Sequence, residues 1–287
     1  MPPDVSNHAA TRPQTASAEP PFEWIPGDRS SGLLLICDHA SNVVPAPYGD
    51  LGLPASAFER HIAYDIGCAA MTRRLAKRSG APALLTRFSR LLIDPNRGED
   101  DPTLVMRLSD GALIPGNARI DDAERTRRIE LFHRPYHAAI DAELTAMMAT
   151  GVVPAIASIH SFTPAWRGIA RPWHVGILWD LDDRLNRPLI DALRADGSLM
   201  VGDNEPYDGA LRNDTLFRHG TRRGLAHTLI EVRQDLVADA EKAAAWTDLL
   251  WERIEPLLVH DTMHILRLYG SRSGSVEHCP ATVRRLR

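Results

Sequence analysis

Two histidines, His39 and His160, each follow a continuous apolar run and precede a turn-like stretch with small polar residues. The runs, at 32–37 and 155–159, have the length and composition of strands that are buried on both faces. A neutral imidazole at the end of such a strand is well placed to bind a metal ion in a cleft. A lone histidine there would more often be a core residue bonded to a backbone carbonyl. The second histidine in the same context favours a metal site.

A carboxylate would complete this site, because two imidazoles and one carboxylate are common ligands of catalytic zinc and leave one position for water. Asp65, in the segment HIAYDIG at 61–67, is the carboxylate that we select. We therefore expect His39, Asp65 and His160 to bind zinc or another divalent metal ion. Asp65 could instead cap the helix that follows it, where the helix dipole favours a negative charge.

Glu231 interrupts an apolar, strand-like segment at 227–233. A carboxylate is costly to bury unless it is paired or used. We predict that Glu231 is a general base, which takes a proton from water and passes it to a leaving amine. The alternative is a salt bridge with Arg233, which lies two residues further on the same face of the strand.

Arginines near these segments could bind an anionic part of a substrate, because a guanidinium group can form two parallel hydrogen bonds with a carboxylate. Arg90 and Arg97 frame a strand-like apolar segment, and Asn96 precedes Arg97. Arg171 lies in the basic loop that follows His160. We predict that these three arginines and Asn96 bind the substrate. The alternative for the arginines is surface ion pairing.

Other polar residues have roles that the sequence leaves open. Ser161 follows His160 and could serve a serine hydrolase, but chain neighbours seldom form a nucleophile–base pair and the sequence has no G-x-S-x-G elbow. His137 and His219 could support the site from outside it or be structural. His61 is expected to be structural or a neighbour of the site.

The elements that would position these residues alternate between short apolar runs and amphipathic segments. Such alternation is typical of an α/β domain with a mixed, mostly parallel central sheet flanked by helices. Asp121 should cap a long helix, and Pro135 should kink it or split it in two. A loop at 98–120 should cover one face. Strands are expected at 32–37, 83–86, 155–159, 173–179, 199–201 and 227–233, and helices at 56–61, 66–78, 121–148, 188–195 and 238–258.

We expect one ordered domain at 22–269, because no repeat or linker divides it. A disordered N-terminal tail at 1–21 would precede the domain, since this stretch is rich in Pro, Ala, Ser and Thr and lacks apolar periodicity. A polar, basic tail at 270–287 would follow it.

Composition argues against several classes of function and location. A formal net charge of −4 and a pI of about 6.3 give no electrostatic basis for binding nucleic acid or an anionic membrane. No apolar run approaches the ~20 residues of a membrane span, and no signal peptide is evident. The three cysteines form no CxxC pair and fit a reducing compartment. We expect a cytoplasmic protein, and nothing in the sequence indicates its oligomeric state.

The order of motifs resembles the N-formylglutamate amidohydrolase family over roughly residues 33–258. Eight motifs in one order are more specific than any one of them. The matching motifs are CDHASN (37–42), HIAYDIG (61–67), SRLLIDPNR (89–97), RPYH (134–137), SIHSFTP (158–164), RPWHVGILW (171–179), GDNEPY (202–207) and IEVRQDL (230–236).

The resemblance implies a fold similar to that of zinc carboxypeptidases, with a mixed sheet flanked by helices. In those enzymes a His-Ser-aromatic strand end supplies a zinc ligand, and a glutamate followed two residues later by an arginine is the general base. The stretches SIHSF and IEVR match these elements. Zinc carboxypeptidases usually place a glutamate three residues after their first histidine, where this chain has Asn42, a poor zinc ligand. For this reason we select Asp65.

The resemblance also implies hydrolysis of the C–N amide bond of a small molecule, an N-acyl amino acid such as N-formyl-L-glutamate. The products would be formate and L-glutamate, and the arginines would hold the carboxylates. Two alternatives stay open. One is a peptidase or amidase that acts on another small amide, and the other is a non-catalytic metal- or anion-binding protein on the same fold. No sequence element distinguishes a formyl group from a larger acyl group.

Overall fold

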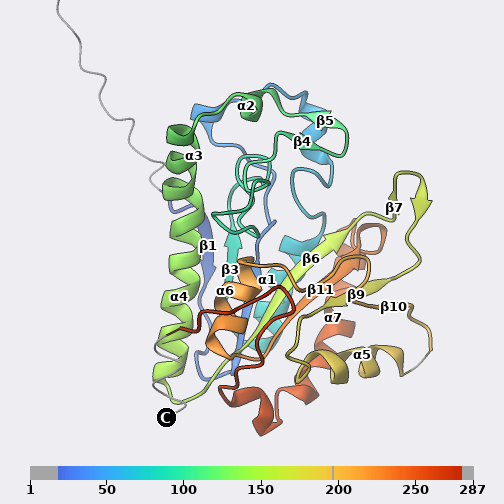
Figure 1. Cartoon of the computed structure of the whole chain (residues 1–287). Helices are drawn as coiled ribbons and strands as arrows, with labels where there is room; N and C mark the ends of the chain where they lie inside the picture. Colours follow the sequence, from blue (N-terminus) through green and yellow to red (C-terminus); the bar gives the residue numbers. More distant parts are fainter. Residues whose placement is uncertain (1–18, 196, 280–287) are drawn as a thin grey trace, which may run out of the picture.

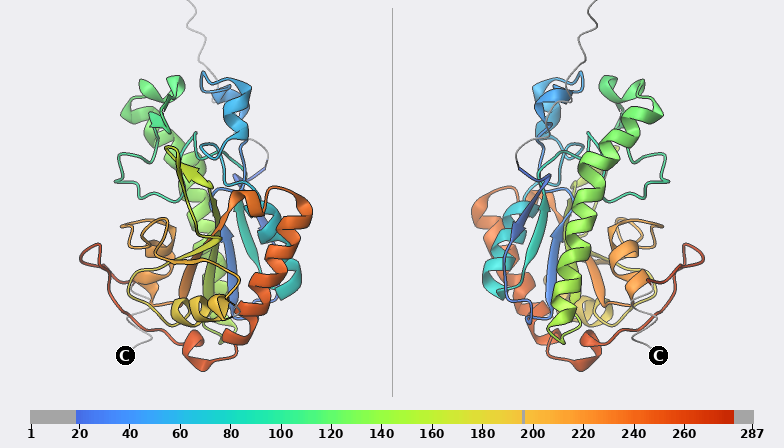
Figure 2. Two further views of the ribbon diagram at one scale, coloured as in Figure 1. Left: turned by 90° about the vertical axis from the view of Figure 1, so that its right-hand side faces the viewer. Right: turned by 90° about the vertical axis from the view of Figure 1, so that its left-hand side faces the viewer.

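A seven-stranded sheet with helices on both faces forms the centre of the molecule (Figures 1 and 2). The computed structural model describes residues 19–195 and 197–279. The predicted α/β class, with a mixed central sheet flanked by helices, is confirmed. Most of the N-terminal tail expected at 1–21 lies outside the described residues.

The strand order is β1-β3-β2-β6-β11-β9-β10. The neighbours β3, β2, β6 and β11 are parallel, whereas β1 runs antiparallel to β3 and β9 runs antiparallel to β11. Four parallel strands therefore end at one edge of the sheet, where ligands usually bind in α/β folds. The strands are β1 (Phe22–Ile25), β2 (Leu33–Cys37), β3 (Ala83–Thr86), β6 (Ala155–Phe162), β9 (Val175–Leu178), β10 (Val201–Asp203) and β11 (His227–Arg233). Two hairpins project beyond this edge (Figure 1), β4 (Leu108–Ser109) with β5 (Ala112–Leu113) and β7 (Ala165–Trp166) with β8 (Ile169–Ala170).

Helices α1 (Cys68–Ser79), α5 (Asn186–Arg194) and α7 (Ala240–Ile254) cover one face of the sheet, and α4 (Arg134–Ala149) and α6 (Thr215–His219) cover the other (Figure 2). Leu33 and Leu35 of β2 pack in the first layer, whereas Leu34 and Ile36 pack in the second. This two-sided burial explains why β2 is a continuous apolar run. No helix in the described ranges is long and apolar enough to cross a membrane.

The predicted long helix is present, and it is interrupted next to Pro135 as expected. Asp121 caps α3 (Asp122–Arg128) by accepting a hydrogen bond from the backbone N–H of Glu124 at 2.8 Å. A π-helical turn, Ile129–His133, then connects α3 to α4. Pro135 is the second residue after this turn, and its missing N–H removes one bond from the helical ladder there.

Several predicted boundaries were wrong. The segment 88–97 forms turns and no strand, because its apolar side chains enter a separate core cluster beyond the sheet. The helix expected at 56–61 is a single 3₁₀ turn, Ala55–Glu59. The strand at 155–159 continues to Phe162, which pairs with Arg233 in β11, so His160 lies within the strand and not at its end. The loop predicted at 98–120 contains the β4–β5 hairpin and the short helix α2 (Pro115–Ala118).

Residues 270–279, the described part of the expected basic tail, lie against the domain. The guanidinium group of Arg272 donates two hydrogen bonds to Asp208, at 2.9 and 2.7 Å, and its Nε lies 3.2 Å from Asp180. The backbone N–H of Cys279 donates to the carbonyl of Arg222 at 2.8 Å. This part of the tail is therefore bound to the loop that carries Asp208.

Candidate metal centre and active site

The candidate site lies where the parallel strands end. His39 is the second residue after β2, and Asp65 precedes α1 by three residues. His160 in β6 and Glu231 in β11 are register partners, so their side chains lie on the same face of the sheet. All four residues line one cavity of about 370 Å³.

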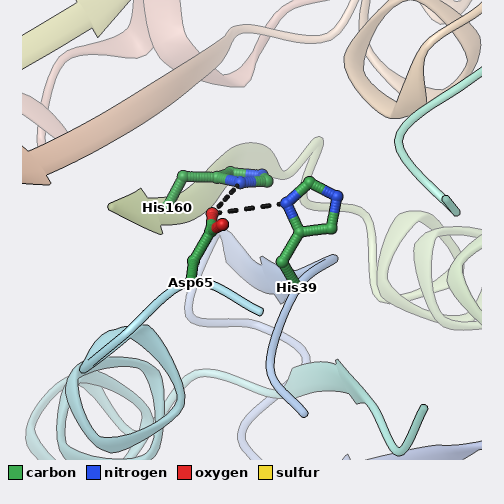
Figure 3. Close-up of side chains that lie close together, drawn as sticks. All are labelled: His39, Asp65 and His160. Carbon is green, nitrogen blue, oxygen red and sulfur yellow. Dashed lines mark hydrogen bonds and ion pairs between the residues drawn. The ribbon is translucent and has the colours of Figure 1, made fainter. Parts of the chain in front are cut away.

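His39, Asp65 and His160 form a compact, buried group (Figure 3). Their candidate ligand atoms all lie within 4.8 Å of one another. The Nδ1 atom of His160 is 2.8 Å from Asp65 Oδ2, and the Nδ1 atom of His39 is 3.3 Å from the same oxygen. The structure thus brings together the three residues selected from the sequence as metal ligands.

A second carboxylate contacts the other nitrogen of each histidine. His39 Nε2 is 2.7 Å from Asp94 Oδ1, and His160 Nε2 is 3.2 Å from Asp38 Oδ2. Since an ionised carboxylate only accepts, each Nε2 donates to its carboxylate. Each Nδ1 faces Asp65 and is the nitrogen that would bind a cation in place of a proton. Metal-binding histidines are usually oriented by a carboxylate in this way.

Sequence reasoning missed the roles of Asp38 and Asp94. Each is a fully buried acid that directly follows an apolar run, which is the signal that identified Glu231. Asp94 accepts a hydrogen bond from Arg90 at 2.6 Å, and Asp38 accepts one from the Thr215 hydroxyl at 3.0 Å. Burial alone would raise the pKa of both acids, but the cation of Arg90 at Asp94 and the imidazole of His160 at Asp38 outweigh it. Both pKa values are therefore below the ordinary value.

The electrostatics of the cluster favour a cation. Burial alone would raise the pKa of Asp65, but His39 and His160 outweigh it and hold that pKa well below the usual range. Burial alone would lower the pKa of His160, but its hydrogen bonds to Asp38 and Asp65 hold the pKa well above the usual value. Negative charge thus dominates around the two imidazoles, and a divalent cation there would take the place of a proton.

Glu231 has no ion-pair partner in the described chain. Its Oε2 atom is buried and lacks a hydrogen-bond partner among the described residues. Burial raises the pKa of Glu231 to about 7, against the opposing effect of His160 and with a contribution from Asp65. The predicted alternative, a salt bridge with Arg233, is wrong, because Arg233 donates to Asp235 at 2.8 Å.

The residues predicted to bind substrate fall into two groups. Arg90, Asn96 and Arg97 line the cavity. Arg90 is directed at the carboxylates of the site, since it donates to Asp94 and its Nη1 lies 3.6 Å from Asp65 Oδ1. Arg171 is not among the described residues that line the cavity. It lies beside the mouth, where it donates to Tyr207 Oη at 3.0 Å.

Two alternatives drawn from the sequence do not match the geometry, and Asn42, which the sequence disfavours as a metal ligand, lies outside the cluster. The N-cap of α1 is Gly67 and not Asp65, whose side chain contacts the histidines. Ser161 donates its hydroxyl proton to the carbonyl of Ile66 at 2.7 Å, so it is not paired with His160. Asn42 donates to the carbonyl of Phe58 at 2.8 Å and is not part of the cluster.

The donor set fits a divalent transition metal. It consists of two imidazole nitrogens and one carboxylate oxygen, each available from a buried side chain. Such a nitrogen-rich set suits zinc better than calcium or magnesium, which prefer oxygen donors. Glu231, whose Oε2 atom lacks a partner among the described residues, lines the same cavity, as a general base would require.

Comparisons with known proteins agree with the motif order. The family model for N-formylglutamate amidohydrolase matches residues 31–238. A gene product of Agrobacterium tumefaciens with a solved structure is 34% identical, with a TM-score of 0.79, over 84% of this chain and 96% of that chain. The N-formylglutamate amidohydrolase of Ralstonia eutropha is 22% identical, with a TM-score of 0.58, over 83% and 97%. A search of the curated proteins finds no match. The chain belongs to the N-formylglutamate amidohydrolase family and is a hydrolase that acts on C–N bonds.

Proposed function

We propose that this protein is a metal-dependent amidohydrolase that cleaves an N-acyl amino acid of the N-formyl-L-glutamate type into formate and L-glutamate. The observation that carries the proposal is the unpartnered carboxylate of Glu231 beside the buried group of His39, Asp65 and His160. The cavity of about 370 Å³ lies in the range of small-molecule sites, roughly 300–1,000 Å³.

His39, Asp65 and His160 would hold zinc or another divalent metal ion, which supplies Lewis acidity that polarises a carbonyl and acidifies water. Glu231 accepts a proton from the water that attacks the acyl carbon. It then donates this proton to the nitrogen as the C–N bond breaks, so that a carboxylic acid and an amine result. A pKa of about 7 suits both steps, because the carboxyl group can take up and release a proton near neutral pH.

Asn96 and Arg97 are our candidates for binding the carboxylates of the substrate inside the cavity. The Nη1 atom of Arg97 donates to the Asn96 carbonyl at 3.2 Å, and its one ion pair among the described residues is a long one, 4.0 Å from Nε to Asp101. Arg90 would act mainly through the site carboxylates that it contacts. Arg171 would contribute at the mouth of the cavity.

Replacing Glu231 by Gln tests the proposal. The amide has nearly the same shape but cannot accept the proton, so hydrolysis of N-formyl-L-glutamate by the zinc-loaded enzyme should fall by about 10²–10⁴-fold. Glu252→Gln, at an exposed position of α7, is the matched control and should keep wild-type activity. An unchanged rate in Glu231→Gln would exclude the catalytic role.

A substrate panel should accompany that measurement. It contains N-formyl, N-acetyl and dipeptide forms of glutamate, of aspartate and of neutral amino acids. We expect N-formyl-L-glutamate to be the best substrate. Hydrolysis of dipeptides without hydrolysis of N-formyl compounds would support a peptidase instead, and no hydrolysis at all would support a non-catalytic binding protein.

A further inference from the structure

The segment 94–97 carries three residues of the candidate site but belongs to no helix or strand. Asp94 contacts a histidine of the metal cluster, and Asn96 and Arg97 line the cavity. Because no backbone ladder fixes this segment, the positions of its side chains depend on what binds its peptide groups.

Two buried histidines bind these peptide groups from the side of helix α4. His133 Nε2 is 2.9 Å from the carbonyl oxygen of Arg97, and His137 Nε2 is 3.0 Å from that of Pro95. A carbonyl only accepts, so both Nε2 atoms donate. The histidines are four residues apart and therefore lie on successive turns of one helix face. His133 is also the last residue of the π-helical turn, an irregularity that often occurs at functional sites.

His137 is itself held in place by a series of hydrogen bonds between polar side chains. Its Nδ1 atom is 2.8 Å from His219 Nε2, and the two rings stack with centroids 5.1 Å apart. His219 Nδ1 donates to Asp141 Oδ1 at 3.0 Å, and Arg223 donates to the same oxygen. This series of hydrogen bonds thus runs from the Pro95 carbonyl to the Asp141 carboxylate at the surface of α4.

The contacts determine where the protons lie. His137 Nε2 donates to a carbonyl and His219 Nδ1 donates to a carboxylate, so both nitrogens carry protons. The 2.8 Å contact between the remaining nitrogens needs one more proton, since two lone pairs would otherwise face each other. That proton would give the pair of imidazoles one positive charge. Burial disfavours this charge and lowers the pKa of both rings, to well below the usual value at His137, and the adjacent carboxylate of Asp141 offsets only part of this effect at His219.

We propose that His137 is a positioning residue, which fixes the segment 94–97 so that its side chains can bind the substrate. His219 and Asp141 keep the Nε2 proton of His137 directed at the Pro95 carbonyl. The inference rests on the proposed function where it concerns substrate binding. The fixing of the segment itself can be measured without substrate.

Two substitutions at His137 test the role in binding. His137→Leu removes the donor while keeping an apolar side chain, so KM for N-formyl-L-glutamate should rise on the order of tenfold, with kcat within about threefold of wild type. His137→Gln keeps an N–H donor near the position of Nε2 and should restore KM to within about threefold. An unchanged KM in His137→Leu would overturn the proposal.

His227→Leu is the matched control. His227 is also a buried histidine, 4% exposed, and its Nδ1 atom bonds to the carbonyl of Leu225, away from the site segment. This variant should unfold at a lower temperature but keep the wild-type KM. A rise in KM equal to that of His137→Leu would show that any loss of core packing has this effect, and the positioning role would be excluded.

Hydrogen exchange gives a readout that does not need activity. The backbone amides of Asp94, Asn96 and Arg97 should exchange faster in His137→Leu than in wild type, and at the wild-type rate in His227→Leu. Equal exchange in wild type and His137→Leu would overturn the proposal. If the exchange rates follow this pattern but the wild-type protein hydrolyses no N-acyl amino acid, only the proposed function is refuted.

If His137→Leu does not fold, Asp141→Asn tests the same series of hydrogen bonds. The Asp141 side chain is 39% exposed, and faster exchange at 94–97 is again expected.

Discussion

The acids around the cavity differ in pKa according to their neighbours. Asp38, Asp65 and Asp94 are buried next to imidazole or guanidinium groups, which outweigh burial and lower their pKa. Burial dominates at Glu231 and Asp214, and it raises the pKa of each to about 7. An acid with a lowered pKa stays ionised at neutral pH, whereas an acid with a pKa near 7 can gain and lose a proton there. We therefore propose that the first group binds a cation and orients the histidines, and that Glu231 transfers protons.

Asp214→Asn should stabilise the protein above neutral pH. The folded-state pKa of about 7 exceeds the unfolded value of roughly 3.9. Ionisation therefore costs stability progressively as the pH rises from 4 to 7, and no cost exists below pH 4. Asparagine keeps the cap acceptor, which receives the Phe217 N–H at 2.7 Å. At pH 8 the free energy of unfolding should exceed that of wild type by on the order of 1–3 kcal/mol, measured by denaturant titration.

The control for this prediction is Asp239→Asn. Asp239 caps α7 in the same way, by accepting from the Lys242 N–H at 2.9 Å, but hydrogen bonds with Lys242 lower its pKa. This variant should show no gain in stability as the pH rises. A difference between Asp214→Asn and wild type that does not change from pH 4 to pH 8 would contradict the assigned pKa.

At the scale of elements, one buried amide joins three segments beside the cavity. Asn117 in α2 donates to the carbonyls of Leu91 and Met106, at 2.7 and 2.8 Å. Its Oδ1 atom accepts from Arg128 of α3 at 2.7 Å. The turns after Arg90, the loop before β4 and the long helix are therefore linked through a single side chain. This explains how a region with little regular structure can hold pocket residues in place.

Asn117→Ala should destabilise the protein by about 2–4 kcal/mol, because one buried carbonyl, one partly buried carbonyl and a buried guanidinium group lose a partner. Asn42→Ala, which loses a single hydrogen bond to Phe58, is the comparison and should cost about 1 kcal/mol. Denaturant titration measures both free energies of unfolding. Equal losses in the two variants would show that the Asn117 amide does not join the segments.

At the scale of the whole molecule, the candidate metal ligands connect distant parts of the chain. His39 and Asp65 are 26 residues apart, and Asp65 and His160 are 95 residues apart. A metal ion held by all three would bind the folded state and not the unfolded chain, so it would stabilise the entire domain.

Zinc added to chelator-treated protein should raise the melting temperature by about 5–10 °C at saturating concentration. His160→Ala should abolish this rise, because it removes one of three ligands. His61→Ala is the matched control, since His61 lines the cavity but lies outside the ligand group. A zinc-dependent rise that persists in His160→Ala would place the metal elsewhere, and no rise in wild type would refute the metal site.

The sequence by itself determined the features that depend on chain neighbours. Apolar runs predicted the strands ending at Cys37 and Arg233, because burial on both faces requires continuous apolar residues. Alternation of runs and amphipathic segments predicted the mixed sheet. The histidines that follow the runs at 32–37 and 155–159, together with Asp65 from the segment HIAYDIG, predicted the group of His39, Asp65 and His160.

Only the tertiary structure decided which groups are paired. It brought Asp94 to His39 across 55 residues and Asp38 to His160 across 122 residues. It also turned Arg90 toward the site carboxylates and left Glu231 without an ion-pair partner in the described chain. Pairing depends on distance in space and on exclusion of water, and neither quantity is a property of chain neighbours.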